Sequence, residues 1–114
     1  MGNSVIYTPF FESRCKRFLK KFASLENELV ELEKDLLQNP ELGEPLGAGL
    51  YKIRLASKDK KKGKSGGFRI ITYLIKETKG AYEIFFIIIY DKSEEGSLKK
   101  PQLLKLIKSI FPTI

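Results

Sequence analysis

The segment from Tyr82 to Tyr90 restricts the possible folds of this chain more than any other part of its sequence. It is apolar at almost every position and rich in isoleucine, phenylalanine and tyrosine, which predicts a β-strand. A strand with one solvated face alternates polar and apolar residues, whereas a continuous apolar run is expected where both faces are covered. The run is far shorter than the roughly 20 residues that cross a bilayer. We therefore predict a central strand with other elements packed on both of its faces.

The remaining segments predict two helices before the sheet and one after it. Apolar residues recur at helical spacing from 12 to 23 and from 25 to 38, and Asn39-Pro40 ends the second helix. Residues 39 to 49 hold two prolines and three glycines and are expected to form a loop. Strands are expected at 5–8, 51–56, 68–75 and 82–90, and a last helix at 98–111. The order β-αα-βββ-α predicts one α+β domain over residues 1–114.

Histidine is absent and Cys15 is the only cysteine, which excludes several kinds of active site. Ser-His-Asp and Cys-His catalytic groups, histidine-ligated zinc and an intramolecular disulfide are all impossible. Cys15 lies on the apolar side of the first expected helix and is interpreted as a core residue. The single thiol and the lack of a signal-peptide pattern are typical of a cytoplasmic protein. We expect no metal, no cofactor and no membrane partner.

The formal net charge of +7 is concentrated in one stretch. Residues 52 to 69 contain eight lysines or arginines and one aspartate, and so carry a charge equal to the whole excess. Residues 24 to 51, in contrast, contain seven acidic residues and one lysine. A positive field concentrated in this way attracts a polyanion, most commonly a nucleic acid. A solvated lysine-rich loop is the alternative interpretation.

Gly63-Lys64-Ser65 resembles the end of a nucleotide-binding P-loop, but its surroundings do not fit. That loop needs a glycine five residues before Gly63, where this sequence has Lys58, and it needs a helix after the motif. The residues from Phe68 to Tyr73 have the pattern of a strand instead. A P-loop is therefore not expected.

The lysine-rich segment has the groups that RNA cleavage without metal requires. It places five lysines before Arg69, namely Lys58, Lys60, Lys61, Lys62 and Lys64. Neighbouring ammonium groups disfavour one another's charged form, which lowers the pKa of a lysine and lets it act as a general base. Arg69 is suited to stabilise a phosphoryl transition state, while the RNA 2′-hydroxyl is the nucleophile. The same groups would also form a non-catalytic phosphate clamp, and both interpretations stay open.

Tyr90 ends the last expected strand and Lys92 lies just beyond it, and an antiparallel meander of the three strands would bring them beside the lysine-rich segment. Tyr90 is expected either to stack on a base or orient a phosphate, or to pack in the core. Asp91, Glu94 and Glu95 have no complementary ligands at metal-site spacing and are interpreted as solvated charges.

Several of these segments together resemble the HigB-like branch of the RelE/ParE toxin superfamily. They are QNPELG at 38–43, YKIRLA at 51–56, KGKSGGFRII at 62–71, and YDKSE at 90–94, which is similar to that branch's Tyr-Ala-Lys-Asn-Glu segment. The resemblance covers roughly residues 39 to 107, and the lysine–glycine–glycine–arginine segment is its most specific part. The sequence departs from the pattern at Ser93, in place of asparagine, and at Asp91, in place of a small residue. A carboxylate at Asp91 is expected either to weaken phosphate binding or to pair with a lysine.

The resemblance implies a toxin of a type II toxin–antitoxin pair, with a RelE-like fold in which two N-terminal helices and a C-terminal helix pack on an antiparallel sheet. The ribonuclease members of the superfamily cut mRNA in the ribosomal A site. It assigns the catalytic roles to Lys62, Lys64, Arg69, Tyr90 and Lys92. We expect RNA binding by the neighbouring basic residues Arg54, Lys58, Lys60 and Lys61. The implied partners are translated mRNA, the ribosome and an acidic antitoxin that covers the basic face. A ParE-like toxin that binds DNA gyrase without catalysis, and a non-toxic nucleic-acid-binding module, are the alternatives.

Overall fold

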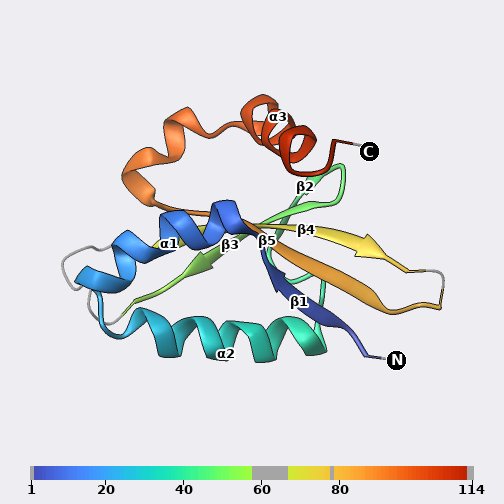
Figure 1. Ribbon diagram of the computed structural model, residues 1–114, viewed down its shortest axis with the longest axis horizontal. Helices are drawn as coiled ribbons and strands as arrows, with labels where there is room; N and C mark the ends of the chain where they lie inside the picture. The colour runs from blue at the N-terminus through green and yellow to red at the C-terminus, as the bar shows by residue number, and fades with distance from the viewer. Residues whose placement is uncertain (1, 58–66, 78, 113–114) are drawn as a thin grey trace.

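The computed structural model describes residues 2–57, 67–77 and 79–112. Figure 1 shows its helices packed around one twisted sheet. The elements in chain order are β1 (Ser4–Tyr7), α1 (Pro9–Lys21), α2 (Leu25–Gln38), β2 (Glu44–Gly47), β3 (Leu50–Leu55), β4 (Phe68–Lys76), β5 (Tyr82–Asp91), the 3-10 helix η1 (Lys92–Ser97) and α3 (Lys100–Ile110). The predicted α+β fold is confirmed. An additional strand, β2, lies in the segment expected to be a loop, because a short edge strand tolerates proline and glycine that a central strand would not.

The strands form one sheet in the order β1-β5-β4-β3-β2. Neighbouring strands from β2 to β5 are antiparallel, so the meander of the last three predicted strands is confirmed. β1 runs parallel to β5, with Ser4 opposite Glu83 and Tyr7 opposite Phe86. The sheet is therefore mixed: it is antiparallel from β2 to β5, as expected, and the pairing of the first strand, which the sequence left open, is parallel. Tight turns force consecutive strands to be antiparallel, whereas no such turn joins β1 to β5.

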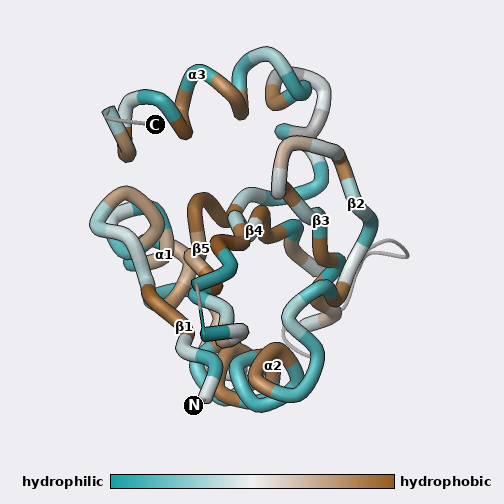
Figure 2. The backbone as a smooth tube through the Cα atoms, turned by 90° about the vertical axis from the view of Figure 1, so that its right-hand side faces the viewer, coloured by the Kyte–Doolittle hydropathy of each residue, from teal (hydrophilic) through white to brown (hydrophobic). Residues whose placement is uncertain are grey.

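The two faces of the sheet carry separate apolar cores. On one face α1 and α2 pack against the sheet through residues that include Phe11, Cys15, Leu25, Leu29, Leu32 and Leu36. On the other face α3 packs through Leu103 and Ile107. Figure 2 shows α2 and α3 on opposite sides of the sheet. Because β5 contributes buried residues to both cores, the prediction that both of its faces are covered is confirmed.

A β-bulge in β5 changes which residues face each core. Ile71 pairs with Ile88 and Thr72 pairs with Phe86, so Ile87 is an extra residue in the ladder. Without it, Tyr90 would lie opposite Phe68, on the α1–α2 face. The bulge places Tyr90 opposite a different residue and in the core beneath α3. Bulges re-aim side chains in this way next to functional sites.

The helix boundaries differ from the expected ones at the N-terminal end of α1. This helix begins at Pro9 and not at residue 12, because Thr8 caps it and proline suits the first helical position. The Phe11 backbone N–H donates to Thr8 Oγ1 at 3.2 Å. α3 lies within its predicted range, and α2 ends at Gln38, just before Asn39-Pro40, as predicted.

Candidate nucleic-acid interface

Three of the predicted site residues lie side by side across the sheet. Arg54 on β3 is directly opposite Arg69 on β4, and Arg69 is directly opposite Tyr90 on β5. Directly opposite residues in antiparallel strands point to the same face, with Cβ atoms about 4.5–5.5 Å apart. Since Tyr90 packs in the core beneath α3, all three side chains belong to that face. We call these three residues the Arg–Arg–Tyr row.

The Arg–Arg–Tyr row runs from the surface into the interior. Arg54 is exposed, Arg69 is only 5% exposed and Tyr90 is 1% exposed. Like charges placed directly opposite each other destabilise a sheet by roughly 0.2–1 kcal/mol. Locally destabilising pairs of this kind are concentrated at functional sites. The two guanidinium groups, one of them in a region of low dielectric, are suited to attract an anion to this end of the sheet.

The lysine-rich segment joins the two strands that carry the arginines. The described residues before it end at Ser57, just after β3, and those after it begin at Gly67, just before β4. Gly67 has a φ of +104°, and a Cβ there would overlap the carbonyl oxygen of Leu55, so only glycine fits. Five predicted residues, Lys58, Lys60, Lys61, Lys62 and Lys64, lie outside the described residues, and their roles stay predictions.

The residues that follow Tyr90 turn away from the row. Asp91 lies opposite Phe68, which packs in the α1–α2 core, so Asp91 does not share the face of Tyr90. Its Oδ1 accepts a hydrogen bond from the Ser93 backbone N–H at 3.1 Å. Lys92 begins η1 and is exposed. The structure thus brings Arg54, Arg69 and Tyr90 together, and it leaves Lys92 at the surface beyond the end of β5.

Glu94 is held by an arginine from the first helix, so its interpretation as a solvated charge is wrong. Arg14 Nη2 lies 3.1 Å from Glu94 Oε2, and Arg14 Nε donates to the carbonyl oxygen of Ile89 at 3.1 Å. Glu94 Oε1 also accepts from the Asp91 backbone N–H at 3.0 Å. Because Arg14 and Glu94 are 80 residues apart, no local sequence pattern indicated this pair.

A pocket of about 240 Å³ lies between the start of α3 and the β2–β3 hairpin. Tyr90 forms part of its lining, together with three lysines that the sequence analysis did not select, Lys52, Lys99 and Lys100. Lys52 comes from β3 and the other two from the beginning of α3. Lys52 belongs to the basic stretch 52–69, and the sequence signal for Lys99 and Lys100 is a further group of lysines after residue 98, whose position over β3 depends on how α3 packs.

A comparison with solved structures identifies the fold. No protein-family model matches the sequence. The structure of a mutant of the E. coli toxin RelE in the free state, with two arginines replaced by alanine, superposes with a TM-score of 0.56. The match covers 100% of this chain and 99% of that chain, at 17% sequence identity. This chain has a RelE-like fold. At this identity the likeness concerns the fold alone.

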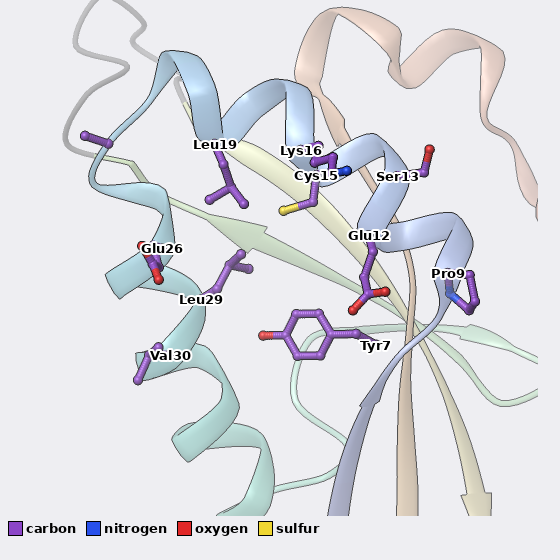
Figure 3. Close-up of a pocket in the computed structure, with 11 residues that line it drawn as sticks. Tyr7, Pro9, Glu12, Ser13, Cys15, Lys16, Leu19, Glu26, Leu29 and Val30 are labelled. Atoms are coloured by element: carbon purple, nitrogen blue, oxygen red, sulfur yellow. The ribbon is translucent and has the colours of Figure 1, made fainter.

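A second pocket in the RelE-like fold, of about 960 Å³, lies between α1 and α2 on the opposite face of the sheet from the Arg–Arg–Tyr row (Figure 3). Leu19, Leu29 and Val30 give it an apolar lining. Two of its groups, Cys15 and Tyr7, are unsuited to proton transfer near neutral pH. Burial raises the pKa of the Cys15 thiol to about 11, and burial and the hydrogen bond to Glu33 hold the pKa of Tyr7 well above its usual range. The prediction that Cys15 is a core residue is confirmed, since it is 4% exposed.

Within residues 2–57, 67–77 and 79–112, no group of three or more carboxylates and thiols is arranged to hold a metal ion. No helix in the same ranges is long and apolar enough to cross a membrane.

Proposed function

We propose that the protein is the toxin of a type II toxin–antitoxin system and a metal-independent endoribonuclease that cleaves translated mRNA in the ribosomal A site. The observation that carries this proposal is the Arg–Arg–Tyr row. It lies in a RelE-like fold, at the end of the sheet where β3 ends before the lysine-rich segment and β4 begins after it. The segments that resemble the superfamily contain all three residues of this row, and the resemblance assigns catalytic roles to two of them, Arg69 and Tyr90. The HigB-like branch is part of the same proposal.

The proposed reaction needs no metal and no histidine. The RNA 2′-hydroxyl attacks the adjacent phosphorus, and a lysine, Lys62 or Lys64, takes its proton as general base. The bond to the 5′-oxygen breaks, and that oxygen receives a proton from a general acid, Tyr90 or Lys92. The products are a 2′,3′-cyclic phosphate and a 5′-hydroxyl. Arg69 stabilises the charge that develops on the phosphoryl oxygens, an effect that is large where water is excluded.

The burial of Arg69 and Tyr90 restricts the route of the RNA. Tyr90 borders the pocket beneath the start of α3, and this pocket is the proposed entry to it. Arg69 lies beside Tyr90 and is largely buried. Its charge is therefore screened less by water and salt than the charge of an exposed side chain. Arg54, which is exposed, makes the first contact with the RNA backbone.

The proposed partners follow from charge. The basic end of the sheet attracts mRNA and the ribosome, and an acidic antitoxin would neutralise the toxin by covering the same charges. A cytoplasmic location is part of this proposal, because its substrate is being translated.

Expression from a tight promoter, with mapping of the 5′ ends of cellular mRNA, tests the proposal. We expect growth arrest and cuts within the codons of translated messages. Lys64→Ala, Arg69→Lys and Tyr90→Phe are each expected to reduce cutting by at least about tenfold, because a positioned proton donor, acceptor or charge contributes 10²–10⁴-fold in typical enzymes. Lys79→Ala is the matched control, since Lys79 is an exposed lysine in the turn between β4 and β5, at the other end of the sheet.

Three outcomes separate the candidate functions. Undiminished cutting by Lys64→Ala and Arg69→Lys, in variants that melt like the wild type, would show that the mechanism is wrong. Growth arrest with an SOS response and intact mRNA would indicate a gyrase-binding toxin. Neither arrest nor cutting would indicate a nucleic-acid-binding module.

A further inference from the structure

Three lysines surround the pocket of about 240 Å³ beside the Arg–Arg–Tyr row. Lys52 projects from β3, while Lys99 and Lys100 stand at the beginning of α3. The ammonium group of Lys100 reaches across to the β2–β3 hairpin, where a Cβ on Gly47 would lie only 2.8 Å from it. Two elements that are distant in the sequence thus direct positive charge around one cavity.

The fold does not account for the charges of Lys99 and Lys100. No acidic residue occupies the first turn of α3, and cations at a helix N-terminus oppose the helix dipole. Over the described parts of the chain, neither Lys99 nor Lys100 forms a salt bridge. Lys52, whose side chain is 18% exposed, lies 3.9 Å from a Glu44 carboxylate. The two lysines of α3 beside it are therefore better explained by an anion that they bind.

The cluster continues the line of charge that the row begins. Lys52 and Arg54 lie two positions apart on β3, so they share a face and stand about 7 Å apart along the strand. This separation is similar to that of successive phosphates in an extended single strand. Resting on the ribonuclease function proposed above, we infer that Lys52, Lys99 and Lys100 bind the phosphate next to the scissile one on the same RNA strand.

The shape of the site favours a phosphate over the surface of an acidic protein. The cavity is small and concave, and apolar residues such as Leu46 and Leu103 line the rest of it. A single compact anion fits such a site, and lysine binds phosphate as a point charge. Tyr90 is shared between the cavity and the row, which places the bound phosphate adjacent to the reacting one.

Two short ligands with blocked 2′-hydroxyl groups test the inference on the whole protein. 2′-O-methyl UpU has one phosphate between nucleosides, and 2′-O-methyl UpUpU has two. In NMR titrations at low salt, we expect the wild type to bind UpUpU about fivefold more tightly than UpU, because one exposed charge pair contributes a factor of about this size. The variant Lys99→Ala/Lys100→Ala should lose this gain. The matched control Lys105→Ala/Lys108→Ala removes two exposed lysines from the same helix and should retain it.

The salt dependence gives a second measurement. Each phosphate neutralised on a single strand contributes about −0.7 to the slope of log affinity against log salt. UpUpU should therefore have a steeper slope than UpU with the wild type and the control, and an equal slope with Lys99→Ala/Lys100→Ala.

The outcomes distinguish this inference from the proposed function. If the wild type cuts mRNA but Lys99→Ala/Lys100→Ala keeps the gain for UpUpU, the inference is wrong and the ribonuclease function stands. If the wild type cuts no mRNA and the gain still depends on these lysines, the phosphate site stands and the ribonuclease function is wrong. If triglutamate binds with the same affinity as UpUpU, and Lys99→Ala/Lys100→Ala weakens both equally, the site recognises an acidic protein partner and the inference is wrong.

Discussion

Arg14 connects the first helix to the end of the strand that carries Tyr90, and its removal has a calculable effect. Arg14→Met keeps an apolar stem and removes both the hydrogen bond to the Ile89 carbonyl and the ion pair with Glu94. The side chains of Arg14 and Glu94 are 24% and 39% exposed, so solvent limits the ion pair to about 0.5–1 kcal/mol. The hydrogen bond to the carbonyl adds about 1 kcal/mol. We expect Arg14→Met to lower the free energy of unfolding by about 1.5–2 kcal/mol.

Urea unfolding of a double-mutant cycle measures the ion pair by itself. Glu94→Gln keeps an oxygen to accept from the Asp91 N–H and removes only the charge. Arg14→Met and Glu94→Gln should couple by about 0.5–1 kcal/mol at low salt and by less in 1 M NaCl. The pair Lys34–Glu31 is the control, because both side chains are about two-thirds exposed and their coupling should be near zero. Additive effects of the Arg14 and Glu94 substitutions at low salt would refute the reasoning.

Three further predictions concern backbone and buried groups. Gly67→Ala should cost about 2–4 kcal/mol in urea unfolding, because of its positive φ and its overlap with Leu55, whereas Gly80→Ala, with open space around it, should cost about 1 kcal/mol. Tyr7 has a raised pKa in the folded state, so above about pH 10 the folded protein keeps a proton that the unfolded chain has lost. The free energy of unfolding of the wild type should therefore fall as the pH rises above about 10, and that of Tyr7→Phe should fall less over the same range. At pH 8 the Cys15 thiol, with a pKa of about 11, should react with Ellman's reagent at least about a hundredfold more slowly in the folded protein than in urea, and similar rates would contradict its burial.

The parts of the fold that follow from local patterns were predictable from the sequence. The apolar run of β5 predicted cover on both faces, and the hairpin between β4 and β5 predicted their antiparallel pairing. The parallel pairing of β1 was not predictable, since no turn links it to β5 and its register depends on contacts across the whole chain. The strand β2 was missed because its proline and glycine lower the propensity of a segment whose pairing is supplied by β3.

The candidate site was predictable as a set of residue types and not as an arrangement. Arg54, Arg69 and Tyr90 could be selected from charge and from the resemblance, but the side of the sheet on which Tyr90 lies depends on the bulge at Ile87. A single added residue in a strand reverses the face of every residue after it, and no pattern in a uniformly apolar run marks its position. The pocket lysines were missed for a related reason, because Lys99 approaches β3 only through the packing of α3.

The helices on the two faces of the sheet carry different net charges. α2 contains five acidic residues and one lysine, and α1 on the same face contains five lysines or arginines and one glutamate, so the charges of these two helices cancel. α3 and the residue before it contain four lysines and no acidic residue, and they lie on the other face. The sheet separates α2 from α3, so a polyanion is attracted more strongly to the α3 side than to the α2 side. A uniformly basic surface of equal net charge would bind the proposed RNA substrate in many orientations. With an excess of charge on the α3 side, the encounter favours the orientation that presents the Arg–Arg–Tyr row, and the same field directs the proposed acidic partner to the same face.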